Sequence, residues 1–411
     1  MKAAAAIDGE RLWRRHMALA EIGATGKGGV NRQALGADEA RARALLAEWA
    51  GERGYRVSVD GISNLFVRRE GTDPALAPVL TGSHIDSQPT GGRFDGAYGV
   101  LAALEALQAL DEAGIETARP IEAVAWLNEE GSRFAPGMMG SEAFCNLRPL
   151  DDILAVTDRA GVSVADELPR ALAATPGAER REIGFPVAAF VEAHIEQGPA
   201  LERAGLPIGV VTGIQGVRRM RVRVTGEEAH AGTTPPSARR DALWEAARMI
   251  DALQRNIHRT EEHRFTVGMM EIRPNVPSVV ASEVLFSIDI RHPDSDTLAR
   301  LEAGVAAICR GASLACDFES WTIAASPSIR FDDRVVDTVE AAAADLGLGH
   351  MRIFSGAGHD ARQLSHVCPT GMIFVPCEGG ISHNEAENAT PADLADGARV
   401  LAETLVRLAA G

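Results

Sequence analysis

The chain is short of basic residues and of long apolar runs, and each shortage excludes a class of protein. Its 41 lysine and arginine residues stand against 57 acidic ones, which gives a formal net charge of −16. Nucleic acids and anionic membrane surfaces attract basic proteins, so we expect neither as a partner. No apolar stretch approaches the ~18 residues that a transmembrane helix requires. The sequence therefore predicts a protein that neither binds nucleic acid nor spans a membrane.

Cysteine is also scarce, with five residues and no C-x-x-C pair. Disulfide frameworks use even numbers of cysteines, and cysteine zinc sites use closely spaced pairs, so we expect reduced, packed thiols. The small apolar segment 1–7 is interrupted by Asp8 and Glu10 before it reaches the length of a secretory signal. These features together predict a cytoplasmic localisation.

Three familiar motifs are missing or incomplete. The segment Gly26-Lys27-Gly28 lacks both the spaced glycine and the Ser or Thr of a phosphate-binding loop. Residues 356–361 match G-x-G-x-x-A, but they lie late in the chain, with little room for a dinucleotide-binding half after them. There is no G-x-S-x-G around a nucleophilic serine. The sequence therefore does not favour a nucleotide-binding enzyme or a serine hydrolase.

The most informative stretch is residues 79–96, which has the sequence VLTGSHIDSQPTGGRFDG. It predicts a strand that ends at His84, followed by a loop with two carboxylates. A metal-bound histidine usually needs an acceptor on its other ring nitrogen, and Asp86 lies on the same side of an extended chain. Asp95 then remains as a possible metal ligand. One histidine and one aspartate in a loop are more often a plain polar turn, so the hypothesis depends on the rest of the chain.

Three further predicted strands deliver ligand-type side chains to their carboxyl ends, at Glu129 and Glu130, at His194, and at His383. In an α/β sheet these ends converge on one edge. Neighbouring residues of an extended chain point to opposite sides, so one of the paired glutamates can bind a metal while the other faces a substrate. The predicted nitrogen and oxygen ligands are His84, Asp95, Glu130, His194 and His383. Five ligands exceed the needs of one tetrahedral ion, which predicts two divalent ions sharing a carboxylate.

The order of predicted elements indicates two domains. Residues 1–212 and 326–411 predict an α/β catalytic domain with a mixed sheet and flanking helices, in which segment 151–182 is a helical surface excursion. Residues 213–325 predict an inserted α+β domain, because a half-buried strand with a basic face (217–224) opens a β-α-β-β-α-β order. That order is typical of a ferredoxin-like fold.

Seven motifs occur in the order H-I-D, G-G-R-F-D-G, N-E-E-G-S-R-F, H-I-E-Q-G-P, H-A-G-T-T-P, S-G-A-G-H-D-A and S-H-N-E. In this order, and from about Trp13 to the last helix, the chain resembles the hydantoinase/carbamoylase branch of dinuclear-zinc amidohydrolases and peptidases. The resemblance implies a zinc-peptidase-like catalytic domain with an inserted lid and dimerisation domain. It also implies one ion on His84, Asp95 and His194, a second on Asp95, Glu130 and His383, and Glu129 as general base. Zn, Mn, Co and Ni all suit such nitrogen and oxygen sites.

The resemblance implies further roles outside the ligand set. His230 would stabilise the oxyanion in the partner subunit's site of a homodimer, although an isolated loop histidine is more often solvated or structural. Asn275 and Arg291 would hold a substrate carboxylate, for which a bidentate arginine is well suited, although Arg291 could equally be a surface residue. Gly358 would offer its backbone N–H to the substrate, and the amide of Gln197 could recognise a ureido group.

The expected activity is metal-dependent hydrolysis of N-carbamoyl-L-amino acids, small ureido acids, to the free amino acid, CO2 and ammonia. Allantoate amidohydrolase and β-ureidopropionase activities are alternatives with the same chemistry. The segments 213–216 and 376–380 favour the carbamoylase members over the allantoate ones. A catalytically idle scaffold is a further alternative, but such a chain would be expected to lose the base or a ligand, and all are present.

Overall fold

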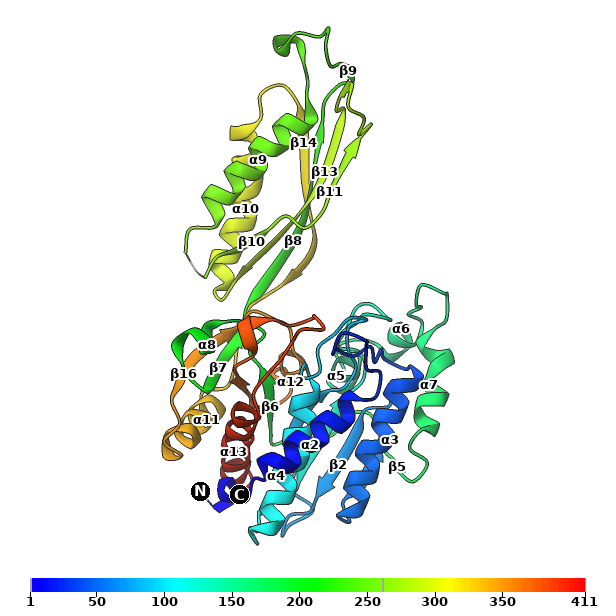
Figure 1. The fold of residues 1–411 in the computed structure, drawn as a ribbon, viewed down its shortest axis with the longest axis vertical. Helices are drawn as coiled ribbons and strands as arrows, with labels where there is room; N and C mark the ends of the chain where they lie inside the picture. Colours follow the sequence, from blue (N-terminus) through cyan, green and yellow to red (C-terminus); the bar gives the residue numbers. More distant parts are fainter. Residues whose placement is uncertain (1, 261, 411) are drawn as a thin grey trace. The chain divides into compact units, whose positions relative to one another are not determined.

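The computed structural model describes residues 2–260 and 262–410. The chain divides into two compact units, Met1–Thr212 with Phe331–Gly411 (unit 1) and Gly213–Arg330 (unit 2) (Figure 1). The first boundary coincides with the predicted one. The return to unit 1 falls after residue 330 and not after 325, and the last long strand of unit 2 extends to Ser326. Among the described residues, no helix combines the length and the apolarity needed to cross a bilayer.

Unit 1 is a mixed sheet with helices on its faces. The elements of this sheet and of the helices around it, in chain order, are α1 (Lys2–Ala5), α2 (Gly9–Ala20), α3 (Ala37–Glu52), β1 (Arg56–Val59), β2 (Leu65–Arg69), β3 (Val79–His84), α4 (Ala97–Glu112), β4 (Ile121–Trp126), α5 (Met139–Phe144), α6 (Leu150–Leu154), α7 (Val164–Ala173), β5 (Glu179–Arg180), β6 (Ala189–Ile195), α8 (Ala200–Ala204), β7 (Ile208–Ile214), β15 (Ile329–Arg330, the last residues of unit 2, paired with β7), α11 (Asp333–Asp345), β16 (His350–Ser355), α12 (Ala361–Leu364), β17 (Thr370–Val375), η2 (Glu378–Gly380) and α13 (Pro391–Leu408).

The strands of this sheet follow the order β15-β7-β17-β6-β3-β4-β2-β1-β5, and β16 also pairs with β7. The four central strands β17, β6, β3 and β4 run parallel to one another. All of their residues are buried, which explains why their sequences are mostly continuous apolar runs without alternation. Parallel strands end at a common edge, so the side chains that follow these four strands are brought together there.

Helix α4 packs on β3, β4 and β6, and α13 and α2 pack against α4 (Figure 1). Every residue of α4 from Ala97 to Leu110 is buried, so this helix forms the centre of the helical layer. The last helix starts as predicted, with Pro391 in its first turn and the N–H of Asp393 donating to Thr390 Oγ1 (3.1 Å). Sequence and packing therefore agree on this half of the unit.

Most residues of the segment 151–182 are exposed or half-buried, as predicted for a helical surface excursion, but a few apolar side chains are buried. Helices α6 and α7 bury Ile153, Val164 and Leu168 in a hydrophobic cluster that also contains Leu127. Leu127 directly follows β4, so this segment covers the strand end that leads to the paired glutamates. The buried apolar residues are few and are spread over two short helices. In an acidic, alanine-rich segment they form no clear periodic pattern, so their burial was not predicted.

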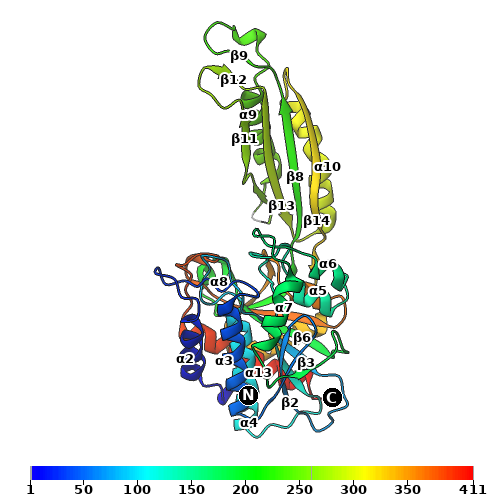
Figure 2. The same ribbon diagram turned by 90° about the vertical axis from the view of Figure 1, so that its right-hand side faces the viewer.

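Unit 2 has the predicted ferredoxin-like arrangement. Its elements are β8 (Gly216–Thr225), β9 (Ala229–His230), η1 (Pro236–Ala238), α9 (Ala242–Ile257), β10 (Arg264–Thr266), β11 (Met270–Arg273), β12 (Val279–Val280), β13 (Glu283–His292), α10 (Ser295–Ala312) and β14 (Asp317–Ser326). The antiparallel order is β10-β13-β8-β14, with β11 also paired to β13, so the second strand of the motif is split in two. Strands β9 and β12 form a separate two-stranded ribbon (Figure 2).

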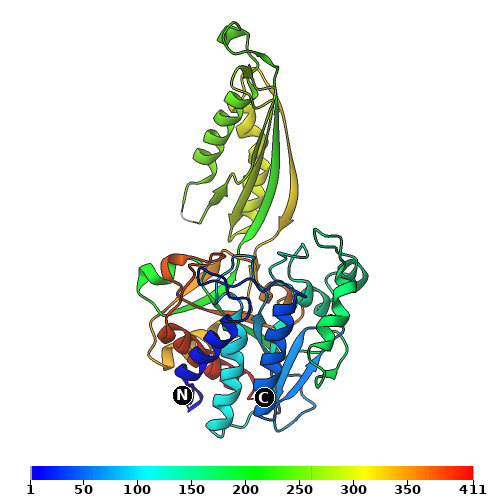
Figure 3. The ribbon, with the colours of Figure 1, turned by 45° about the vertical axis from the view of Figure 1, so that its right-hand side comes forward.

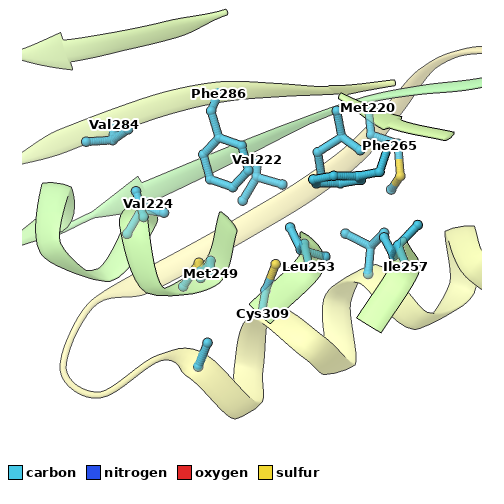
Figure 4. Close-up of a cluster of buried hydrophobic side chains, with 14 of the residues drawn as sticks. Met220, Val222, Val224, Met249, Leu253, Ile257, Phe265, Val284, Phe286 and Cys309 are labelled. Atoms are coloured by element: carbon cyan, nitrogen blue, oxygen red, sulfur yellow. The ribbon is translucent and has the colours of Figure 1, made fainter. Parts of the chain in front are cut away.

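Helices α9 and α10 cover one face of the unit 2 sheet (Figure 3). Buried and half-buried residues alternate strictly along β13, as expected for a sheet with one covered face. Val222, Val224 and Phe286 point toward Met249 and the other helix residues in the core (Figure 4). The predicted half-buried character of segment 217–224 is confirmed, since its alternate residues enter this core.

Candidate metal centre

The first group of possible ligands consists of His84, Asp95 and His194, whose ligand atoms all lie within 4.8 Å of one another. His84 ends β3 and His194 lies near the end of β6, so two adjacent parallel strands supply the imidazoles. His194 Nε2 is 3.3 Å and His84 Nε2 is 3.9 Å from Asp95 Oδ1. All three residues are buried. Two imidazoles facing one carboxylate oxygen form a donor set that suits a divalent transition-metal ion.

The second group is Asp95, Glu130 and His383, again with ligand atoms within 4.8 Å. His383 Nε2 lies 3.2 Å from Asp95 Oδ2 and 3.3 Å from Glu130 Oε2. Asp95 thus turns Oδ1 toward the first group and Oδ2 toward the second. This is the arrangement required of a carboxylate that bridges two ions.

A third group, Glu192, His194 and His359, also meets the distance condition. Glu192 Oε1 accepts a hydrogen bond from Ser83 Oγ (2.6 Å), and Oε2 accepts one from the backbone N–H of Ala361 (3.0 Å). Both carboxylate oxygens are therefore engaged by protein donors. This group is less suited to an ion than the other two.

Gly96 explains the D-G pair at the end of the 79–96 stretch. Its φ is +63°, and a Cβ at this position would lie 2.3 Å from His84 Nε2. Its backbone N–H donates to His194 Nε2 (3.2 Å). Only glycine allows the chain after Asp95 to pass this close to both imidazoles.

Asp86 contacts His84 chiefly through its backbone oxygen. His84 Nδ1 lies 3.0 Å from the backbone oxygen of Asp86 and 3.6 Å from its carboxylate, so the carbonyl is the hydrogen-bond acceptor. The carboxylate oxygens instead accept the backbone N–H groups of Glu129 and Glu130, each at 3.2 Å. The predicted acceptor is therefore the Asp86 carbonyl at hydrogen-bond distance, with the carboxylate farther off but still raising the pKa of His84. The carboxylate is turned aside by those two N–H groups, 43 and 44 residues along the chain. Asp86 orients the first histidine and the two glutamates together.

Glu129 belongs to neither ligand group, yet its Oε2 lies 3.5 Å from His84 Nε2. Burial raises the pKa of Glu129 well above its usual range; the positive charge of His84 opposes this shift, and the carboxylates of Asp360 and Glu130 add to it. Burial and the charge of Asp95 raise the pKa of Glu130 to about 7. A carboxylate with a raised pKa can take and release a proton near neutral pH, which is the property of a general base.

The electrostatics of the site favour positive charge. Burial alone lowers the pKa of His84 and of His194, but the nearby carboxylates outweigh burial, chiefly Glu129 for His84 and Asp95 for His194, and raise both pKa values. The hydrogen bond to Asp95 raises the pKa of His383 to about 9. A divalent cation would satisfy the same carboxylates. The donor types and the charge balance therefore fit a metal centre.

Two predicted substrate-binding residues lie in unit 1. Gln197 Nε2 donates to Asp95 Oδ2 (3.1 Å) and to Ser382 Oγ (3.0 Å), so its amide faces the second ligand group. The backbone of Gln197 is left-handed (φ 56°), a conformation often found at functional sites. Gly358 lies exposed between β16 and α12, where a Cβ would come within 2.6 Å of Met138 Cε. The structure thus brings Gln197 to the centre, and the space at Gly358 admits only glycine without a shift of Met138.

Gln88 was not among the predicted site residues. Its Nε2 donates to Glu130 Oε2 (2.8 Å), so it contacts a ligand of the second group. The only sequence signal was its place in the loop that follows His84. An amide is a common loop residue, and that position alone did not distinguish it.

His230 lies in β9 of unit 2 and is exposed. Its Nδ1 accepts the backbone N–H groups of Gly232 (3.0 Å) and Thr233 (3.2 Å). The hydrogen bonds made by one ring nitrogen fix the tautomer, so the neutral ring carries its proton on Nε2. The side chain is therefore set up to donate a hydrogen bond outward.

Asn275 and Arg291 also lie in unit 2. Asn275 is exposed with a left-handed backbone (φ 56°). Arg291 donates from Nε (2.9 Å) and Nη2 (3.3 Å) to the two carboxylate oxygens of Asp289. Asp289 and Arg291 are separated by one position on β13, so their side chains lie on the same face of the strand. The guanidinium predicted to clamp a substrate carboxylate is thus already oriented by the carboxylate of Asp289.

An α/β sheet that gathers two metal-ligand groups and a buried glutamate at the ends of its parallel strands defines a metal-dependent hydrolase. The chain belongs to peptidase family M20/M25/M40, whose model matches residues 80–407. It is 41% identical to the N-carbamoyl-L-amino-acid amidohydrolase of Rhizobium meliloti, over 98% of this chain and 97% of that protein. It is 35% identical to the allantoate amidohydrolase of Bacillus subtilis, over 95% of each chain.

Among solved structures, an amidase of the hydantoinase/carbamoylase family from Burkholderia multivorans matches with a TM-score of 0.93 and 46% identity, over 98% of both chains. These similarities confirm the predicted family and fold, and they confirm that the chain is a hydrolase of C–N amide bonds.

Proposed function

We propose that this protein hydrolyses the N-carbamoyl group of N-carbamoyl-L-amino acids and releases the free amino acid, CO2 and ammonia. The observation that carries the proposal is the pair of ligand groups that share Asp95, with Glu129 beside them but outside both. The similarity to the Rhizobium meliloti protein, named for this substrate class, supports the choice of a ureido carbon over a peptide carbon.

The donor set fits two divalent ions, Zn²⁺ or one of Mn²⁺, Co²⁺ and Ni²⁺. His84, Asp95 and His194 would hold one ion, and Asp95, Glu130 and His383 the other. When bound, such ions acidify water and polarise a carbonyl oxygen. Glu129 takes the proton from the attacking water on its carboxylate and later delivers it to the leaving nitrogen. The raised pKa of Glu129 supports the first step, because burial and the neighbouring carboxylates make Glu129 a stronger proton acceptor.

The substrate-binding residues are assigned by their chemistry. The amide of Gln197, next to Asp95, suits the ureido group, and the backbone N–H of Gly358 is a second donor in unit 1. Arg291, oriented by Asp289, and Asn275 suit the substrate carboxylate. His230 offers its Nε2 proton to the developing oxyanion, since its Nδ1 is already an acceptor. Hydrogen-bond donors of this kind discriminate a ureido acid from an uncharged amide.

We infer that the active form is a homodimer in which His230 serves the partner subunit's site. Unit 2 exposes several large apolar side chains, which is typical of an interaction surface: Leu243, Trp244, Met270, Val276, Leu314 and Ile323. The five cysteines are free and buried, which is consistent with a reducing, cytoplasmic environment.

The test is ammonia release from a panel of N-carbamoyl-L- and D-amino acids, allantoate, 3-ureidopropionate and dipeptides. We expect the highest kcat/KM with an N-carbamoyl-L-amino acid, and at least ~10²-fold slower turnover by Glu129→Gln under the same conditions. Faster hydrolysis of allantoate would assign the protein to the second activity. Hydrolysis of dipeptides alone, or of nothing in the panel, would refute the ureido assignment.

A further inference from the structure

Glu387 is a buried carboxylate that belongs to neither ligand group. It follows His383 in the S-H-N-E-A-E segment, and only 1% of its surface is exposed. Its Oε1 accepts the backbone N–H groups of Phe94 (2.8 Å) and Asp95 (3.0 Å). Its Oε2 accepts a hydrogen bond from Ser382 Oγ (2.8 Å). Burying a charge is costly, so three donors converging on one carboxylate indicate a built arrangement rather than a chance contact.

The chain opposite Glu387 is shaped to admit it. A Cβ on Gly92 would lie 2.0 Å from the carboxyl carbon and Oε1 of Glu387. The second glycine of the G-G-R-F-D-G motif is therefore required by this carboxylate and not by a turn. Across residues 2–260 and 262–410 the structure records no ion pair to Glu387, so backbone and hydroxyl donors alone hold it.

These contacts join two separate loops. One loop carries Asp95, whose backbone N–H donates to Glu387. The other loop carries Ser382, which precedes His383 and donates its hydroxyl to Glu387. Ser382 Oγ also lies 3.3 Å from Asp95 Oδ2, but a hydroxyl has one hydrogen and its shorter contact is to Glu387. Asp95 Oδ2, which also accepts a hydrogen bond from Gln197 Nε2 (3.1 Å), therefore keeps its contact with His383 Nε2, 3.2 Å away.

We propose that Glu387 is a positioning residue that fixes the spacing of Asp95 and His383 and so preforms the second ligand group. The proposal rests on the metal-dependent function argued above. Residues that hold metal ligands in place typically change metal affinity by about 10- to 100-fold when they are replaced. Glu387 has this position with respect to two ligands on two loops, because the fold brings it to the Asp95 loop, 292 residues earlier in the chain.

Three variants separate this role from general stability. Glu387→Ala removes all three contacts. Glu387→Gln keeps a carbonyl oxygen for the Phe94 and Asp95 N–H groups but loses the acceptor for Ser382. The matched control is Glu245→Ala in unit 2, because Glu245 is also buried (3% exposed) and accepts N–H groups of Leu314, Ala315 and Cys316 and the hydroxyl of Ser313, none of which belongs to a ligand group.

The measurement is a Co²⁺ titration of the metal-stripped full chain, followed by calorimetry and by the visible absorption of the bound ion. The parent should bind two Co²⁺ per chain. Glu387→Ala should bind one of them about 10- to 100-fold more weakly with an altered spectrum, Glu387→Gln should lie between it and the parent, and Glu245→Ala should match the parent.

The proposal is overturned if Glu387→Ala titrates like the parent, or if Glu245→Ala loses the same affinity. Should Glu387→Ala fail to fold, Ser382→Ala tests the same link, since it removes the hydroxyl that ties Glu387 to the His383 loop, together with the hydroxyl's contacts to Gln197 and Asp95. A parent-like titration by that variant also overturns the proposal. A parent that binds no Co²⁺ would instead refute the metal-dependent function itself, so the two failures are distinguishable.

Discussion

Replacing Glu129 with glutamine separates proton transfer from metal binding. Glutamine has nearly the same volume as glutamate, so no cavity forms at a side chain that is only 9% exposed. Glu129 lies in neither ligand group, and the loss of one buried negative charge beside Glu130 and Asp360 relieves repulsion. Metal content and fold should therefore be retained. A positioned general base contributes about 10²- to 10⁴-fold, or roughly 3–5 kcal/mol of transition-state stabilisation, so kcat should fall by at least ~10².

The assay pairs ammonia release from an N-carbamoyl-L-amino acid with metal analysis of the same preparation. Glu130→Gln is the matched control: it changes the adjacent residue by the same atoms, but it removes a ligand and should lower the metal content. If Glu129→Gln lost metal while Glu130→Gln kept it, the roles of the two glutamates would be reversed. A Glu129→Gln enzyme with parental kcat would refute the assignment of the base.

Three other predictions follow from particular contacts. Burial lowers the pKa of His16 to about 3, against ~6.5 in the unfolded chain, so its contribution to stability is complete above the unfolded value and is lost as pH falls toward 3. Urea unfolding at about pH 7.5 and about pH 5 should show ~2 kcal/mol more acid destabilisation for the parent than for His16→Gln, and an equal loss in both would contradict this. Arg291→Lys keeps the charge but loses the planar fork, so kcat/KM for the ureido acid should drop by about 10- to 100-fold, while turnover of the corresponding carboxamide, already slow, should hardly change. His230→Ala and Glu129→Ala chains, each nearly inactive alone, should regain activity when mixed under conditions of verified subunit exchange, and no recovery would argue against His230 acting in the partner subunit.

The grouping of the candidate ligands was predictable from the sequence because most of them follow a strand that is easy to recognise. His84, Glu130 and His194 lie at or just beyond the ends of fully buried parallel strands, and fully buried strands are apolar almost throughout. The common edge of such strands then places the side chains together without further information. The alternating pattern of the 217–224 segment predicted the covered face of unit 2 for a similar reason.

Contacts between distant loops were not predictable in this way. The carboxylate of Asp86, expected on His84, also accepts two backbone N–H groups that only the folded chain brings near. Glu387 contacts the Asp95 loop although 292 residues separate them along the chain. Nothing in the local sequence around Glu387 indicates that its side chain is buried. The pairing of Arg291 with Asp289 is local and was still missed, because a strand arginine has many possible partners and spacing alone does not choose among them.

The central claim is that hydrolysis depends on two divalent ions held by the groups that share Asp95. It is tested most directly by measuring the metal content of the purified protein together with ammonia release from an N-carbamoyl-L-amino acid, before chelation, after exhaustive chelation and after re-addition of a divalent ion. We predict about two ions per chain, loss of activity with the ions, and recovery when they are restored. Full activity in protein stripped of metal would contradict the account.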